Sequence, residues 1–195
     1  MGEQLPAPFA SLFLIERSRW QVFSRDWRVN GPDGSLFLVV EHPYSLWQEE
    51  SILYADEQKL QPLLALRQRG AAVSQHDVLE ARSGRCFGSL RGSPLQHFFG
   101  VFGSAARWEI LDEQERSAGA VIEEGSRWRR MLGGGSSFRI ELGNETVALL
   151  ESEFGLLRRR FWLTLLPARN PIDPRFAVAC ALLAMWSTLR RRGER

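Results

Sequence analysis

The chain of 195 residues has one lysine, three histidines and almost no net charge. This composition bears on which charged partners it can bind. Lys59 is the single lysine, so nearly all of the 25 basic residues are arginines. Because 23 acidic residues oppose them, the formal net charge is only +2. A dedicated nucleic-acid-binding domain carries a strong basic excess. We therefore expect no nucleic-acid partner.

Cysteine is also scarce. Cys86 and Cys180 form neither a metal-binding knuckle nor a CxxC redox pair. The absence of a disulfide framework is typical of a reducing compartment, so we expect a cytoplasmic protein that is at most peripheral at a membrane. The first charged residue is the acidic Glu3, and the N-terminal stretch lacks the basic region of a secretory signal.

Long hydrophobic runs are missing. The longest apolar run, 176–186, is shorter than the ~20 residues that a helix needs to cross a bilayer. We predict no transmembrane span, and we interpret the run as a buried helix.

Recognisable catalytic motifs are absent as well. His42, His76 and His97 lie in separate segments, and Asp77 adjoins His76 on a predicted strand, where neighbours point to opposite faces. The glycine-rich stretch 133–136 lacks the Lys-Ser/Thr of a phosphate-binding loop. We predict no catalytic residue, no cofactor and no metal site, and therefore no enzyme.

Most of the chain repeats one pattern, in which two short apolar stretches flank a polar turn. Gly and Asn in the turns supply positive φ, and the alternating flanks favour strands with one buried face. Repeated hairpins of this kind predict a closed or sandwiched sheet. Further strands are expected within 54–69 and 161–166, whereas 43–50 and 93–104 stay unassigned. The predicted hairpins pair 26–29 with 36–40, 77–81 with 86–90, 107–111 with 118–122, and 138–142 with 146–150.

The pattern changes near the C-terminus. Asp173 is a good N-cap and Pro174 suits the first helical position, so we predict a helix over about 174–190. Because this helix is apolar on every side, it must be surrounded on every side. We therefore predict a mainly β protein in which a closed antiparallel barrel encloses a buried C-terminal helix. Residues 1–11 form a loose lead-in, and 12–192 form one domain.

At these residues the chain resembles the tubby-like superfamily, specifically its phospholipid scramblase and LURP-one-related branch. The resemblance spans roughly 12–190 and is most specific in the closing DPRFAVACALLAMW. It implies a barrel of about twelve strands threaded by the hydrophobic helix. The other resembling stretches are LFLIERSRWQVFSRDWRVNGPDG, ILYADEQKLQPLLALRQR, WEILDEQERSAGAVI and FRIELGNETVALLE.

The resemblance also implies functions. Tubby proteins bind phosphoinositide headgroups through basic barrel residues, and eukaryotic scramblases are associated with calcium-stimulated lipid movement. This chain has no cysteine cluster for palmitoylation, and the stretch 167–173 before its helix has one carboxylate, too few ligands for calcium. We therefore do not expect calcium-dependent scrambling.

Two basic clusters are the candidate binding residues for an anionic lipid headgroup or a phosphorylated ligand. Trp128 lies within the first, and its amphipathic ring is typical of a membrane interface. The alternative is that the clusters are solvated and paired with Glu123, Glu124, Glu151 and Glu153. The candidate residues are Arg127, Arg129, Arg130, Arg158, Arg159 and Arg160.

The aromatic stretch 98–102 favours a second hypothesis. It is either a core strand or an exposed patch that contacts a protein partner or a second copy of the chain. The sequence thus predicts a non-enzymatic domain that binds anionic headgroups, and the alternative is a protein-interaction or scaffold domain without lipid binding.

Overall fold

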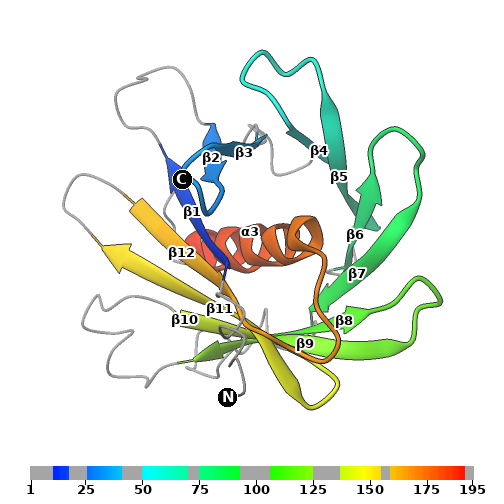
Figure 1. Cartoon of the computed structure of the whole chain (residues 1–195). Coiled ribbons are helices and arrows are strands. Elements are labelled where there is room, and N and C mark those ends of the chain that lie inside the picture. Colours follow the sequence, from blue (N-terminus) through cyan, green and yellow to red (C-terminus); the bar gives the residue numbers. More distant parts are fainter. Residues whose placement is uncertain are drawn as a thin grey trace, which may run out of the picture.

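The computed structural model describes residues 11–17, 26–40, 50–69, 75–92, 106–124, 137–154 and 159–191, without the side chains of 154, 159 and 187–191. These residues form a closed antiparallel barrel of twelve strands around one helix, α3 (Pro174–Arg191), which confirms the predicted fold class (Figure 1). The strands are β1 (Ser11–Arg17), β2 (Trp27–Asn30), β3 (Leu36–Val40), β4 (Glu50–Tyr54), β5 (Pro62–Arg69), β6 (Gln75–Glu80), β7 (Cys86–Gly92), β8 (Arg107–Leu111), β9 (Ser117–Glu124), β10 (Ser137–Leu142), β11 (Glu145–Phe154) and β12 (Arg159–Leu165).

The four predicted hairpins are confirmed as β2–β3, β6–β7, β8–β9 and β10–β11. Gly34 and Gly143 adopt φ of 78° and 59° in two of these turns, as their conformational freedom predicts. The two strands expected around the polar turn at 56–59 are present as β4 and β5, although β4 lies earlier than predicted and ends at Tyr54. The unassigned 43–49 and 93–104 lie outside the described residues.

Side chains alternate between the lumen and the outer wall. In β10, Phe138 and Ile140 are buried in the core, whereas Arg139 lies between them on the wall and pairs with Glu124 and Glu141. Phe138 also packs against Trp108 from β8, with ring centroids 6.1 Å apart. The alternation therefore separates an apolar lumen from a charged wall.

Helix α3 occupies the lumen, and strands surround it on every side in Figure 1. From Ala177 to Cys180 its residues are 0% exposed, and Leu182 is also fully buried. Burying a leucine completely contributes about 1.5–3 kcal/mol relative to leaving it in water. Alanine at every second or third position keeps the helix narrow enough for the lumen.

Gly88 in β7 fixes where the helix enters. Its φ is 147°, and a Cβ there would lie 2.6 Å from the carbonyl oxygen of Leu111 and 3.2 Å from the ring of Phe176. Because real Cβ atoms do not approach so closely, glycine makes the space into which Phe176 of the first helical turn packs. The strand therefore holds the N-terminal end of α3 in place.

The barrel has two unlike ends. Because neighbouring strands are antiparallel, β2–β3, β4–β5, β6–β7, β8–β9 and β10–β11 are all connected at the same end, which we call the turn end. The segment 166–173 and the start of α3 also lie there, as the contact between Gly88 and Phe176 requires. At 1.5 Å per residue the 18-residue helix is about 27 Å long, so it ends at the opposite end, which we call the helix-exit end.

Candidate functional site

Of the six predicted binding arginines, the structure describes the side chain of Arg160 alone. Its Nε donates to Oε2 of Glu16 at 3.3 Å, across the β12–β1 pair. The two side chains are 32% and 28% exposed, so the ion pair is accessible to solvent. The backbone of Arg159 begins β12, but its side chain is not described. Arg127, Arg129, Arg130 and Arg158, together with Trp128, lie outside the described residues.

The carboxylates that were expected to neutralise these arginines have other contacts. Glu124 accepts from Nη1 of Arg139 at 2.8 Å, and Glu153 accepts from the indole N–H of Trp162 at 3.1 Å. Buried Glu123 accepts from the backbone N–H of Ala106 at 3.1 Å. Pairing of the arginine clusters with these carboxylates therefore stays a prediction.

The described strand ends that flank the two clusters in the sequence lie at one end of the barrel. Glu124, Ser137, Glu151 and Trp162 are paired in a row across β9, β10, β11 and β12. With strands about 4.8 Å apart, this row is about 15 Å long. Strand β9 ends at Glu124 and β12 begins at Arg159, and both of these strand ends lie beside this row, at the helix-exit end.

The helix ends with further arginines at the same end. Arg190 and Arg191 are the last two residues of α3, and Arg192 follows them in the sequence. These arginines are not among the six predicted binding residues, although the order of the elements places them at this end. Strand β12 ends at the turn end, and α3 starts there and runs back through the lumen. The helix therefore ends at the helix-exit end, where β11 and β12 are connected.

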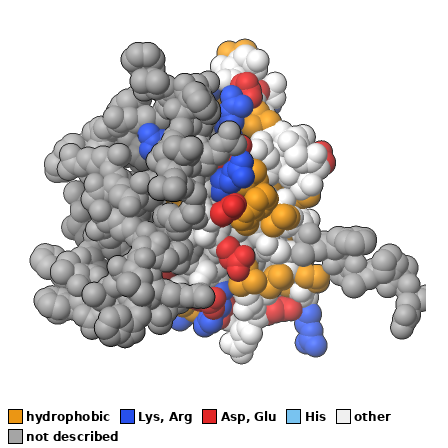
Figure 2. Space-filling view, turned by 90° about the vertical axis from the view of Figure 1, so that its left-hand side faces the viewer, with side chains coloured by type: hydrophobic (Ala, Val, Ile, Leu, Met, Phe, Trp, Pro, Cys, Tyr) orange, Lys and Arg blue, Asp and Glu red, His pale blue; other side chains and the backbone are white. Residues whose placement is uncertain are grey.

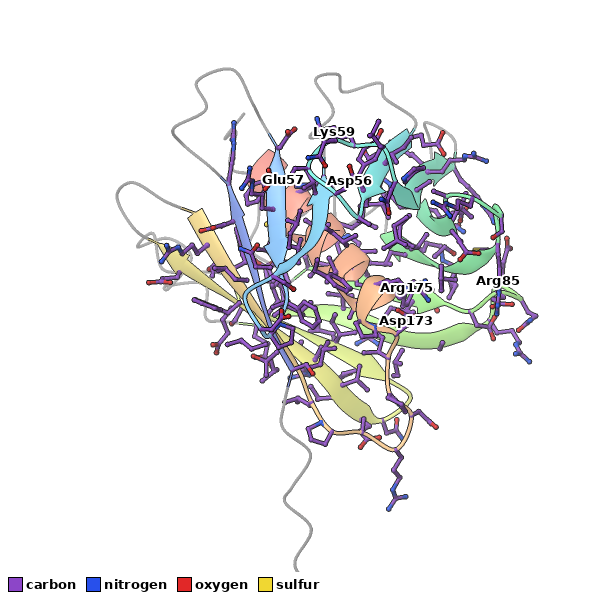
Figure 3. The ribbon with its side chains drawn as sticks, turned by 45° about the horizontal axis from the view of Figure 1, so that its top comes forward. Asp56, Glu57, Lys59, Arg85, Asp173 and Arg175 are labelled. Atoms are coloured by element: carbon purple, nitrogen blue, oxygen red, sulfur yellow. The ribbon has the colours of Figure 1, made fainter. Side chains whose placement is uncertain are left out.

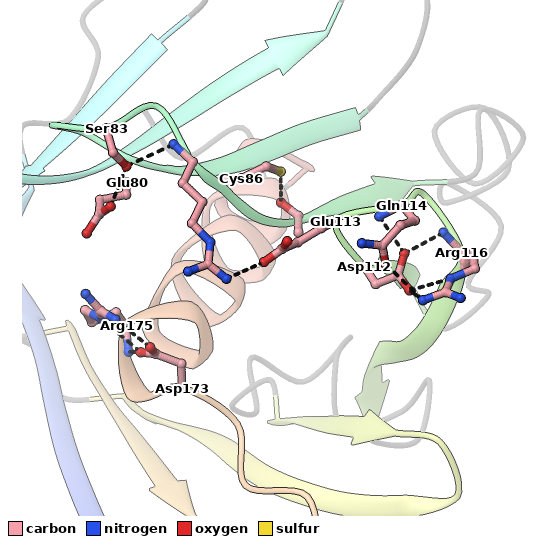
Figure 4. Close-up of polar contacts among 11 residues, drawn as sticks. Glu80, Ser83, Cys86, Asp112, Glu113, Gln114, Arg116, Asp173 and Arg175 are labelled. Carbon is pink, nitrogen blue, oxygen red and sulfur yellow. Dashed lines mark hydrogen bonds and ion pairs between the residues drawn. The ribbon is translucent and has the colours of Figure 1, made fainter.

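Three arginines at the turn end form local ion pairs, which Figure 4 shows. Arg175 pairs with Asp173 at 2.7 Å and lies over the ring of Phe87, 4.8 Å from its centroid. Arg85 pairs with Glu113 at 2.8 Å, and its hydrogen bond to that carboxylate raises the pKa of the guanidinium. Arg116 closes its own turn onto the carboxylate of Asp112.

The β4–β5 turn illustrates how such turns are built (Figure 3). Asp56 accepts from the backbone N–H groups of Leu60 and Gln61, at 3.1 and 2.6 Å. This capping allows Lys59 to adopt a φ of 57°, which is unusual for a residue other than glycine. Lys59 then reaches Asp26 at 3.2 Å, while Glu57 pairs with Arg28 at 3.0 Å.

The wall also carries cross-strand ion pairs. Arg91 and Ser117 hydrogen-bond Glu109 and thereby lower the pKa of its carboxyl. Arg69 binds both Asp77 and Glu115. Because exposed ion pairs contribute only about 0–1 kcal/mol each, these contacts add little to the stability of the fold. Their main effect is to neutralise opposite charges on the outer wall.

Of the three histidines, His76 is the one that the structure describes, and it lies within strand β6. His76 lies opposite Leu90 of the core, whereas Asp77 pairs with Arg69 on the outer wall, so the two side chains point to opposite faces. His42 and His97 lie outside the described residues. Among the residues that the structure does describe, no group of three His, Cys, Asp or Glu side chains is placed to hold a metal ion.

Both cysteines are free thiols. Burial raises the pKa of the Cys180 thiol, which is completely enclosed in the helix core. Burial is also the main cause of the raised pKa of Cys86, whose Sγ lies 3.4 Å from the carbonyl oxygen of Gly88. Neither environment creates a reactive thiolate at neutral pH.

In the described part of the chain, no helix combines the length and the apolar character that crossing a bilayer requires.

The fold defines the class of the protein as a twelve-stranded antiparallel barrel threaded by a C-terminal helix. Among solved structures, the chain is similar to a protein from Arabidopsis thaliana, with a TM-score of 0.54 and 12% identity over 91% of each chain. At this identity the likeness shows the fold alone. No family profile and no curated protein matches the sequence.

Proposed function

We propose that the chain is a non-enzymatic domain of the scramblase and LURP-one-related branch of the tubby-like superfamily, which binds anionic phospholipid headgroups at its helix-exit end. The binding residues are Arg127, Arg129 and Arg130 from the first cluster and Arg158 and Arg159 from the second. The protein acts in the cytoplasm, at the membrane surface. Calcium has no role in this binding.

One observation carries the proposal. The strand ends Glu124, Ser137 and Arg159, from which the two clusters continue, lie at the end of the barrel where α3 also terminates with Arg190 and Arg191. An arginine near an anionic membrane surface contributes about 1 kcal/mol to binding. Because several arginines act from the same end, their contributions can combine on one surface.

Two further features support a binding role over catalysis. Helix α3 fills the lumen with buried side chains, so the barrel interior is packed as a core. Three described arginines at the turn end, Arg85, Arg116 and Arg175, already have carboxylate partners within the chain. Their pairing leaves less positive charge at this end for an external anion.

Co-sedimentation with liposomes tests the proposal. We expect the protein to sediment with vesicles of phosphatidylcholine and phosphatidylserine, and to stay in solution with phosphatidylcholine alone. Raising the salt concentration should weaken binding, since salt screens charges at a surface. Adding calcium or a calcium chelator should leave the sedimented fraction unchanged.

Free inorganic phosphate distinguishes a membrane ligand from a soluble phosphorylated one. Release of the protein from vesicles by millimolar phosphate would indicate a discrete phosphate site. Binding that only salt reverses would indicate a diffuse membrane contact. Failure to sediment with anionic vesicles at any salt concentration would refute the proposal.

A further inference from the structure

The outer wall of β1, β12 and β11 carries an apolar patch, formed by Leu12, Leu14, Leu149 and Trp162. Leu12 is 42% exposed, and the other three side chains are half-buried. Figure 2 shows this side of the molecule, where hydrophobic side chains form a band beside acidic and basic ones.

The register defines the shape of the patch. Leu12 and Leu149 both lie opposite Thr164 and form one row, and Leu14 lies opposite Trp162 in the next row of the same face. Two strand spacings make the patch about 10 Å wide, and the two rows are about 7 Å apart. A stable dimer needs about 800 Å² from each partner, which is more than such a patch provides. Its dimensions fit a short peptide segment.

Carboxylates border the patch. Glu151 lies opposite Trp162, and Glu153 accepts the indole N–H of Trp162. Among the described residues, neither of these two glutamates forms an ion pair, because Arg160 across the strand pairs with Glu16 instead. The border is therefore acidic, which opposes an anionic membrane and favours a cationic partner.

We propose that this patch binds a short protein segment that presents apolar side chains together with lysine or arginine. The apolar side chains cover Leu14 and Trp162, and the cationic groups pair with Glu151 and Glu153. Trp162 is the central anchor, since large aromatic residues beside apolar neighbours carry most of the energy in such contacts. Trp162 and Glu151 belong to the row of strand residues at the helix-exit end, so this patch lies on the outer wall beside that end.

Selection from a random peptide phage library on the full-length protein provides the probe. We expect the enriched peptides to combine apolar and basic residues, and their synthetic forms to bind less tightly as salt is raised. Trp162→Ala should weaken the selected peptide about tenfold or more. The double variant Glu151→Gln/Glu153→Gln, which preserves shape, should also weaken it severalfold. Asp33→Asn/Glu57→Gln removes the same charge at the turn end and should have no effect.

Two outcomes of the selection would overturn the proposal. In the first, no peptide is enriched. In the second, the selected peptides bind the wild type, Trp162→Ala and the double glutamine variant with the same affinity. A dimer in analytical ultracentrifugation that Trp162→Ala dissociates would assign the face to a second copy. Anionic vesicle binding that is lost in Trp162→Ala, yet kept when the arginine clusters are replaced, would assign it to the membrane.

Discussion

Asp173 accepts both the backbone N–H and the guanidinium of Arg175, at 2.8 and 2.7 Å, and so joins the barrel to the first turn of α3. Its carbonyl oxygen also accepts the first helical hydrogen bond, from Ala177 at 2.9 Å. Burial opposes ionisation of this carboxyl, but the hydrogen bonds from Arg175 outweigh it and lower its pKa. One side chain therefore caps the helix that fills the lumen.

Replacing this cap should destabilise the protein. We expect Asp173→Ala to lower the free energy of unfolding by about 0.5–2 kcal/mol, the usual contribution of an N-cap. The pH dependence has a definite sign, because the pKa is lower in the folded chain than its ordinary value of 3.8. The stabilisation is present above that pH and is lost as the pH falls through the folded pKa. Urea denaturation at several pH values should show a smaller acid-induced loss in Asp173→Asn than in the wild type.

Gly119 should tolerate no side chain. A Cβ there would lie 1.9 Å from the carbonyl oxygen of Glu141, a backbone atom that cannot move aside without disturbing β10. We expect Gly119→Ala to reduce the free energy of unfolding by about 2 kcal/mol or more. Gly143→Ala is the matched control, since its φ is positive but its surroundings are open, and it should cost about 1–2 kcal/mol. Equal losses for the two variants would contradict the close strand contact.

The two cysteines should differ in reactivity. We expect a thiol reagent to modify partly exposed Cys86 slowly in the native protein, and Cys180 only after unfolding. Because burial raises both pKa values, modification of the native protein should accelerate with pH only above the range of an ordinary thiol. Mass spectrometry of timed samples, with Cys86→Ala as a control, measures both rates. Rapid native labelling of Cys180 would contradict its place in the core.

Arg160 should matter least among the candidate binding residues. Its guanidinium is already paired with Glu16, so Arg160→Ala removes a cation that is partly neutralised. We expect Arg160→Ala to retain most vesicle binding, whereas Glu16→Gln should strengthen binding by releasing the arginine. Co-sedimentation of the two single variants with anionic vesicles checks both effects. A larger loss for Arg160→Ala than for Arg127→Ala would contradict this order.

Much of the fold follows from local patterns. Alternation such as Phe138-Arg139-Ile140 predicts which side chains enter the lumen, and an all-apolar helix after Asp173 predicts what fills it. The pairing of β1 with β12 joins residues from the two ends of the chain, so no local pattern specifies it. Closure follows instead from the need to surround the helix and to leave no edge strand exposed.

The functional surfaces were less accessible to sequence reasoning. The pairing of Arg160 with Glu16 depends on barrel closure, because 144 positions separate the two residues. The apolar patch was missed for the same reason, since Leu14 and Trp162 are neighbours only across the closing strand pair. The direction of α3 places Arg190 and Arg191 at the end of the barrel where β9 ends and β12 begins, and this direction depends on the barrel topology and not on a local motif.

The most direct test of the headgroup proposal compares two triple variants with equal loss of charge. Arg127→Ala/Arg129→Ala/Arg130→Ala alters the helix-exit end, and Arg82→Ala/Arg85→Ala/Arg116→Ala alters the turn end. Binding to vesicles containing phosphatidylserine should be lost in the first variant and kept in the second, with both proteins unfolding at temperatures close to that of the wild type. Equal binding by the two variants would contradict a localised site and leave only the net charge of the protein as the cause of its attraction to membranes.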